Sequence, residues 1–153
     1  MGIEEESERL VAWGAELRAV HTRLRAALRA VREADGSDDV PARDLLLVCH
    51  GFCVALTEHH EGEDRHLFPA IAAAHPALRD TLERLQQDHA MIAWLLADLA
   101  AAAPTGERGS ISRHLDGIAA IMESHFAYEE RELITVLDAL ALDARPSDVL
   151  GSL

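Results

Sequence analysis

Residues 59–69, HHEGEDRHLFP, place three histidines and three acidic residues in one short stretch of an Ala- and Leu-rich chain. Within this stretch, His59 and Glu63 continue the apolar series of Phe52 and Leu56 at three- and four-residue spacing. That spacing predicts an amphipathic helix. We therefore expect the side chains of His59 and Glu63 to lie on the face that the helix buries.

A second stretch repeats this pattern. Residues 125–135, HFAYEERELIT, begin with a histidine that is followed by acids four and five positions later and by apolar residues eight and nine positions later, as in the first stretch. Here His125 and Glu129 continue the apolar series of Ile118 and Met122. The chain is therefore predicted to bury two His-x-x-x-Glu pairs on two helices.

Two single histidines lie on apolar stripes upstream of these pairs. His89 stands four residues after Leu85 and three before Ile92, and His21 has the same spacing between two leucines. His21 precedes His59 by 38 residues, and His89 precedes the second paired histidine by 36. This internal repeat predicts a doubled helical hairpin in which each half supplies one His and one His-x-x-x-Glu.

Segments rich in Gly, Pro and Asp separate four long stretches with helical periodicity. Strand-favouring residues are sparse, and no stretch alternates apolar and polar residues over the length of a strand. We predict an all-α fold with a single domain over residues 1–153, an up-down-up-down antiparallel four-helix bundle. The expected helices are residues 5–34, 42–74, 76–103 and 110–141, followed by a short C-terminal tail at 142–153.

The spacing along the chain also predicts the level of these side chains in the bundle. Residues of antiparallel helices meet only if they lie equally far from the turn that joins the helices. We take position 61 as the middle of the first His-x-x-x-Glu pair and position 127 as the middle of the second. The midpoints from His21 to 61, from 61 to His89 and from His89 to 127 are Pro41, His75 and Arg108, and all three fall in the predicted turns. We therefore expect six side chains at one level: His21, His59, Glu63, His89, His125 and Glu129.

Such a cluster favours a metal site. Without a cation, each unpaired charge in a Leu-lined core would cost several kcal/mol. Six mixed imidazole and carboxylate ligands for two metals leave room for a further ligand and suit non-haem iron or manganese, with zinc as an additional alternative. The competing interpretation is a metal-free core of hydrogen-bonded His–Glu pairs, which requires the sixfold pattern to be accidental.

At HHEGEDRHLFP and HFAYEERELI, and over residues 15–140, the chain resembles the hemerythrin-like HHE cation-binding family. The resemblance implies a centre of two iron ions that binds dioxygen, nitric oxide or peroxide between four helices. By position, it implies that the four histidines are terminal ligands. It implies that Glu63 and Glu129 are the carboxylate ligands that bridge the two ions.

One position departs from the family pattern. The oxygen-carrying members have a second histidine one turn after the first on the third helix, and here that position is Ala93. A missing ligand leaves a more open metal. Candidate replacements are His66 and Tyr128, and for each we favour a role as pocket lining or as a partner of a ligand over direct ligation.

The remaining polar and sulfur-containing residues receive simpler interpretations. His60 and Asp64 are offset by 100° from the ligand pair on the helical wheel and are expected to be solvated or to orient the imidazoles. Cys49 and Cys53 lie one helical turn apart, which suits buried thiols better than a disulfide and leaves a redox or metal role as the alternative.

Composition limits the partners and the location. The formal net charge of -13, with no basic cluster to offset it, opposes binding to nucleic acid or to an anionic membrane surface. The first residues lack a basic and then apolar leader, and no window reaches the length of a membrane span, so a cytoplasmic protein is expected. All basic side chains are Arg and none is Lys, which hints at a GC-rich bacterial genome.

Two functions are close in rank. The first is a di-iron protein that binds or senses a small ligand, dioxygen, nitric oxide or peroxide. The second is an oxidoreductase that reduces peroxide or nitric oxide, or activates dioxygen to oxidise an organic substrate, and that would require an electron-donor protein. The open position at Ala93 favours the enzyme, whereas the lack of a recognisable reductase segment favours binding. A metal-free helical interaction protein ranks third.

Overall fold

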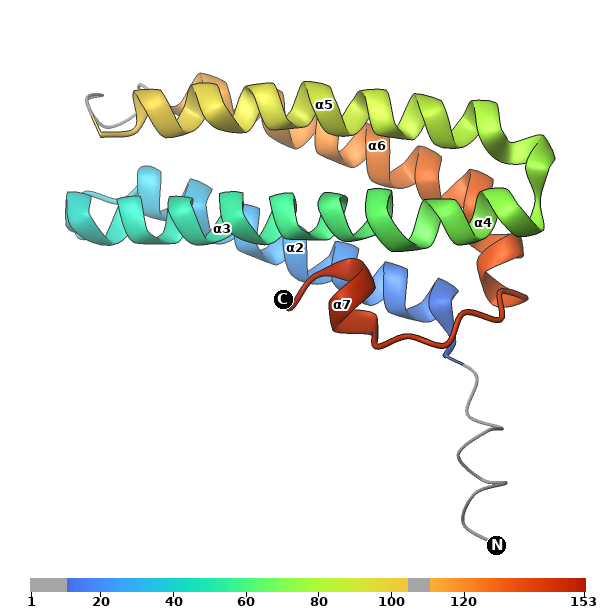
Figure 1. Cartoon of the computed structure of the whole chain (residues 1–153). Helices are drawn as coiled ribbons and strands as arrows, with labels where there is room; N and C mark the ends of the chain where they lie inside the picture. The colour runs from blue at the N-terminus through green and yellow to red at the C-terminus, as the bar shows by residue number, and fades with distance from the viewer. Residues whose placement is uncertain (1–10, 105–110) are drawn as a thin grey trace, which may run out of the picture.

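The computed structural model describes residues 11–104 and 111–153, and every regular element in this part of the chain is helical. The predicted all-α fold is thus confirmed. Figure 1 shows the long helical stretches side by side, with successive stretches running in opposite directions. They are α2, Trp13–Asp35; α3, Ala42–Gly62, which continues into α4, Phe68–Ala74; α5, Arg79–Ala102; and α6, Ser112–Asp138.

The helix ends follow local backbone chemistry. α2 begins at Trp13, and the expected helical residues 5–10 lie outside the described part of the chain, as does the expected start of the fourth helix at 110. α4 ends at Ala74, and the following His75 has a non-helical φ of -135° and ψ of 75° because the next residue is Pro76. The short 3-10 turn Pro76–Leu78 then reverses the chain into α5.

α6 ends earlier than the sequence pattern predicts. Its last residue is Asp138 and not residue 141. Beyond it the chain bends back across the end of the bundle, and the carbonyl of Leu142 accepts a hydrogen bond of 3.1 Å from the indole N–H of Trp13. The expected tail contains one further short helix, α7, Pro146–Leu150.

The second helical stretch contains a π-helical turn at Glu63–Leu67. Pro69 accounts for its position, because proline has no N–H to donate to the carbonyl four residues earlier and its ring crowds that carbonyl. In this turn the N–H of Phe68 donates to the carbonyl of Glu63, which is five residues back and not four as in an α-helix. The wider turn changes the direction in which later side chains project from the helix axis. His66, within the turn, is exposed.

The four stretches enclose one apolar core. α2 packs against α3 and α6, while α5 packs against α6 and α3. Each fully buried large side chain contributes about 1.5 to 3 kcal/mol relative to exposure. The buried side chains come from every long helix and include Leu17, Leu24, Phe52, Leu56, Leu85, Ile92, Leu99, Ile118, Met122, Phe126 and Leu133.

Within the described residues, no helix combines the length and the apolar character that crossing a membrane requires.

Candidate metal centre

All six side chains that the sequence predicts as metal ligands are buried in the core, with at most 4% of their surface exposed. The helices bring them together from distant parts of the sequence. They come from α2 (His21), α3 (His59), the π-helical turn (Glu63), α5 (His89) and α6 (His125 and Glu129).

The buried histidines and glutamates form two adjacent groups, in each of which one ligand atom per residue lies within 4.8 Å of the others. The first group is His21, His59 and Glu129, and the second group is His60, Glu63, His89 and His125. Both groups have the mixed imidazole and carboxylate donors that transition metals accept. The six predicted residues therefore occur together, and a seventh residue joins them.

Glu63 belongs to the second group and also lies next to the first. Its Oε1 is 3.1 Å from Nε2 of His59 in the first group and 3.5 Å from Nε2 of His89 in the second. The Glu63 and His59 side chains leave the helix one turn apart and so project in the same direction. A single carboxylate thus faces two separate sets of imidazole nitrogens.

Glu129 has the matching position on the opposite side. Its Oε1 is 3.1 Å from Nε2 of His21 in the first group, and its Oε2 is 3.4 Å from Nε2 of His125 in the second. The two oxygens of this carboxylate therefore point to different groups. Together with Glu63 this arrangement suits carboxylates that join two cations.

Each of the four predicted histidines has its Nδ1 beside an oxygen that lies outside the two groups. Because a neutral imidazole carries one N–H, donation from Nδ1 leaves the lone pair of Nε2 directed into the site. The acceptors are Glu130 for His21 at 3.2 Å, the Leu150 carbonyl for His59 at 2.8 Å, Asp64 for His89 at 2.8 Å and Asp88 for His125 at 3.1 Å.

Most of the inward atoms, in contrast, lack hydrogen-bond partners, the exception being Nε2 of His89 and of His125, which lie 3.1 Å apart. Nε2 of His21, His59 and His60 and both oxygens of Glu63 and Glu129 are buried without one, although several N···O distances are short. Leaving a buried polar group unsatisfied costs about 1 to 3 kcal/mol, and more if it is charged. A cation would satisfy these atoms together, so the residues present fit bound metal.

Burial and the neighbouring charges set the protonation of the carboxylates. Desolvation and the charge of Glu129 raise the pKa of Glu63 well above its ordinary value. Desolvation would also raise the pKa of Glu129, but the adjacent imidazoles of His125 and His21 outweigh it and lower this pKa well below the ordinary value. In the metal-free pair Glu63 therefore takes up a proton more readily than Glu129, which keeps its charge to lower pH.

The pKa values of the histidines also differ from one another. Burial lowers the pKa of His59, His60 and His89, so these imidazoles stay neutral, as metal ligands must be. Burial also opposes the charged form of His125, but the adjacent Glu129 carboxylate raises the pKa of His125 to about 9.

The prediction for His60 was wrong in part. It is not solvated, because only 5% of it is exposed, and its ring stacks on that of His89 at a centroid distance of 3.9 Å. The signal was present, since His60 lies four residues after Leu56 on the apolar stripe, and such a stripe is more than 100° wide. Asp64, by contrast, orients an imidazole as expected, through its contact with His89.

The two candidate replacements for the missing ligand lie elsewhere. His66 lies within the π-helical turn and is exposed. Tyr128 is half-buried, and its ring is covered by the guanidinium groups of Arg84 at 4.7 Å and Arg131 at 5.3 Å. Neither side chain belongs to the two groups.

Other polar residues divide between the site and the rest of the bundle. Asp88 and Glu130, which contact His125 and His21, were not predicted as partners of the histidines, because their contacts cross between helices. Cys49 and Cys53 are free thiols, buried and half-buried respectively, and the structure places neither in the two groups.

A cleft of about 220 Å³ opens between α3 and α5 beside the second group. His60 and His89 form part of its wall, and Ala93 stands where the family pattern has a histidine. The small side chain of Ala93 leaves this space open. The rest of the lining is Thr57, Glu61, Asp64, Gln86, Ala90 and Leu96.

The fold and the site define a class of protein, a helical bundle whose buried histidines and glutamates can hold metal ions. The model of one family, described as the hemerythrin HHE cation binding domain, matches residues 15–137. The chain belongs to this family, and the predicted resemblance is confirmed. Comparison with curated proteins and with solved structures gave no significant match.

Proposed function

We propose that this protein holds two iron ions and binds or senses a small ligand, dioxygen, nitric oxide or peroxide, at a carboxylate-bridged site. One observation carries the proposal. Glu63 and Glu129 each lie within 3.5 Å of an imidazole nitrogen from both groups. Two carboxylates in this position can link two cations, one in each group.

The donor set is compatible with iron. Imidazole and carboxylate together suit iron and manganese. Zinc, which has no redox chemistry, is the alternative. Bound iron would supply the redox chemistry that dioxygen, nitric oxide and peroxide require. The chain itself holds the ions in a core from which apolar side chains exclude bulk water.

The carboxylates that accept a hydrogen bond from Nδ1 of a histidine set the direction in which its Nε2 points. Asp64 and Asp88 keep His89 and His125 protonated on Nδ1, so that their Nε2 atoms face the second group. We assign His60 as the seventh ligand, because its Nε2 is buried beside this group without a hydrogen-bond partner. It would supply an imidazole to the ion that loses the family's ligand at Ala93.

The cleft supports entry of a small ligand at the second group. Its wall contains His60, His89 and Ala93, so a molecule that enters it meets this group and not the first. The volume of about 220 Å³ exceeds the roughly 10 to 15 Å³ that a cavity needs to hold one water molecule. The site therefore has room for a diatomic molecule or peroxide.

The same cleft favours the alternative, a di-iron oxidoreductase that reduces peroxide or nitric oxide or oxidises an organic substrate. Its volume is larger than a diatomic ligand needs, and Thr57 and Gln86 add polar groups to its wall. This function would also need an electron-donor protein. We further propose that nucleic acid and membranes are not partners, given the net charge of -13. The bacterial source and cytoplasmic location stay predictions.

The direct test is metal analysis with an optical spectrum of aerobically purified protein, beside a His59→Ala variant. We expect the wild type to contain iron at a ratio of about two per chain, with the absorption of a coupled iron pair, and the variant to lose it. A folded wild type that takes up neither iron nor manganese would contradict the proposal.

Addition of peroxide then separates the two functions. A stable spectral change at a stoichiometric dose supports binding or sensing, and it contradicts the enzyme. Continued consumption of peroxide over many equivalents, abolished in His59→Ala, supports the oxidoreductase and contradicts a simple binding protein.

A further inference from the structure

The C-terminal segment, residues 146–153, returns from the end of α6 to the metal centre. α7 packs against α3 and against the π-helical turn, as Figure 1 shows for its position below α3. Val149 and Leu150 are buried, with 1% and 0% of their surface exposed. Their burial anchors the segment as part of the core.

This segment supplies the outer hydrogen-bond partner of one metal-directed histidine. His59 Nδ1 lies 2.8 Å from the carbonyl oxygen of Leu150. The corresponding partners of the other three histidines are carboxylates on the bundle helices or the π-helical turn. The direction of the His59 lone pair therefore depends on a backbone atom of the tail.

Two glycines allow the close approach. A Cβ added to Gly62 would lie 2.3 Å from the carbonyl oxygen of Val149, so an alanine there has no room. Gly151 has a φ of +92°, which L side chains rarely adopt, and a Cβ on it would lie 3.1 Å from the backbone nitrogen of His59. Both sides of the contact thus lack a side chain where one would separate them.

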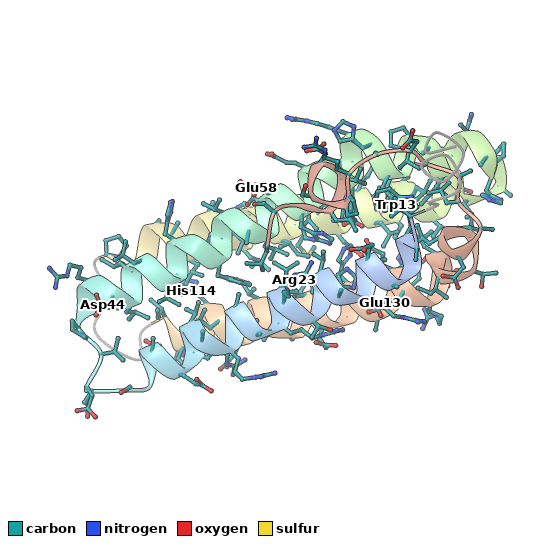
Figure 2. All side chains as sticks on the ribbon, turned by 90° about the horizontal axis from the view of Figure 1, so that it is seen from below. Trp13, Arg23, Asp44, Glu58, His114 and Glu130 are labelled. Carbon is teal, nitrogen blue, oxygen red and sulfur yellow. The ribbon has the colours of Figure 1, made fainter. Side chains whose placement is uncertain are left out.

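Outer contacts hold the end of the segment on two helices. Ser152 Oγ donates to Glu58 Oε2 at 3.1 Å, and Arg23 Nε donates to the carbonyl of Leu153 at 2.6 Å. Figure 2 shows the C-terminal segment passing between Glu58 of α3 and Arg23 of α2. These contacts join the two helices that carry the histidines of the first group.

We infer that residues 146–153 are a positioning element of the metal centre, which keeps the proton of His59 on Nδ1 and so directs its Nε2 to the ion of the first group. The inference rests on the proposed metal site. Without the Leu150 carbonyl, the imidazole of His59 would be free to rotate or to take the other tautomer, and the first group would lose its affinity ahead of the second.

The test compares Gly62→Ala with Gly51→Ala. Both glycines lie within α3, but a Cβ at Gly51 meets nothing within 4 Å, so this variant is a matched control for helix propensity. Iron content, resistance to a chelator and circular dichroism are measured on the full chain. We expect Gly62→Ala to keep its helical signal while metal affinity falls about 10- to 100-fold, as for the loss of other outer partners. Gly51→Ala should bind like the wild type.

A direct readout of the tautomer separates positioning from general stabilisation. Nitrogen-15 NMR of the metal-free protein reports which ring nitrogen carries the proton. We expect His59 to be protonated on Nδ1 in the wild type and to lose this preference in Gly62→Ala, while His89, held by Asp64, keeps it. Equal metal affinity of Gly62→Ala and Gly51→Ala, or an unchanged His59 tautomer, would overturn the inference.

Two further features keep the test decisive. If Gly62→Ala does not fold, Gly151→Ala disturbs the same contact from the tail side and is held to the same criteria. If the wild type binds no metal, the proposed function fails, but the His59 tautomer still reports on the tail. Loss of metal in the variants with no change at His59 counts against positioning.

Discussion

His89 Nε2 of α5 lies 3.1 Å from His125 Nε2 of α6, and the Nδ1 atom of each ring is taken up by an aspartate, Asp64 and Asp88 respectively. Two neutral imidazoles that both donate from Nδ1 would place two lone pairs against each other at this distance. Only a proton or a cation between them relieves that repulsion. In the metal-free chain a proton on His125, whose pKa burial lowers but the Glu129 carboxylate raises to about 9, relieves it, and a bound metal ion would relieve it as well.

Removal of metal should destabilise the protein. The buried atoms without partners would lose the cation that satisfies them. A ligand at 100 times its dissociation constant stabilises the folded state by about 2.7 kcal/mol. For a chain of this size that corresponds to about 5 to 10 °C in Tm. Differential scanning calorimetry before and after chelation measures it, and an unchanged Tm would contradict a metal in the core.

Metal binding should release protons. The pKa of His125 is raised to about 9, so this imidazole holds an extra proton near pH 7 in the metal-free chain, and burial raises the pKa of Glu63 in the same direction. His125 must lose this proton before its Nε2 can bind a cation, so the affinity should increase as the pH rises from 7 towards 9. Calorimetric titration in buffers of different ionisation enthalpy should find about one or two protons released per chain. Binding heats that do not depend on the buffer would refute this.

The outer aspartates should matter more than their exposure suggests. Asp88→Asn removes the charge beside His125 and is expected to weaken metal binding about 10- to 100-fold. Asp98→Asn is the control, because Asp98 pairs with His114 at 3.3 Å across the same two helices but outside both groups. Chelator competition compares the two variants. A similar loss in both would show a general effect of breaking an Asp–His pair.

His60 and His66 provide a matched pair on one helical stretch. His60→Ala removes an imidazole from the second group and should weaken metal binding by more than the roughly tenfold minimum seen for outer partners. His66→Ala changes an exposed side chain and should leave the metal content unchanged. Iron analysis with the optical spectrum tests both. Full metal retention in His60→Ala would remove His60 from the ligand set.

Ala93→His should close the cleft. The new imidazole would occupy space beside His60 and His89 and restore the ligand of the family pattern. We expect metal to be held at least as tightly and added azide or peroxide to react about tenfold more slowly, which is about 1.4 kcal/mol in the barrier.

The control for this change is Ala97→His, one helical turn further along α5, where the residue lines the neighbouring groove and not the cleft. Stopped-flow absorbance follows the reaction in both variants. If Ala97→His slows it as much as Ala93→His does, the cleft is not the path of entry.

The helical period of the sequence was enough to predict the helices and the six buried ligand-type side chains. Periodicity works here because a helix turns its residues in a fixed order, so Leu56 and Ile118 already indicate which face the neighbouring histidines share. The same rule failed where the helix changes its pitch. Pro69 widens the turn at Glu63–Leu67, and a count at 100° per residue misplaces His66, which lies within this turn.

What the sequence by itself determined is the set of residues available to the site, namely two His-x-x-x-Glu pairs and two single histidines at one level of four helices. The tertiary structure decided how they are used. It placed His60 in the second group and brought the Leu150 carbonyl to His59 across 91 residues. Such contacts depend on how the helices and the tail pack and not on any local period, because a backbone carbonyl has no signature in the sequence.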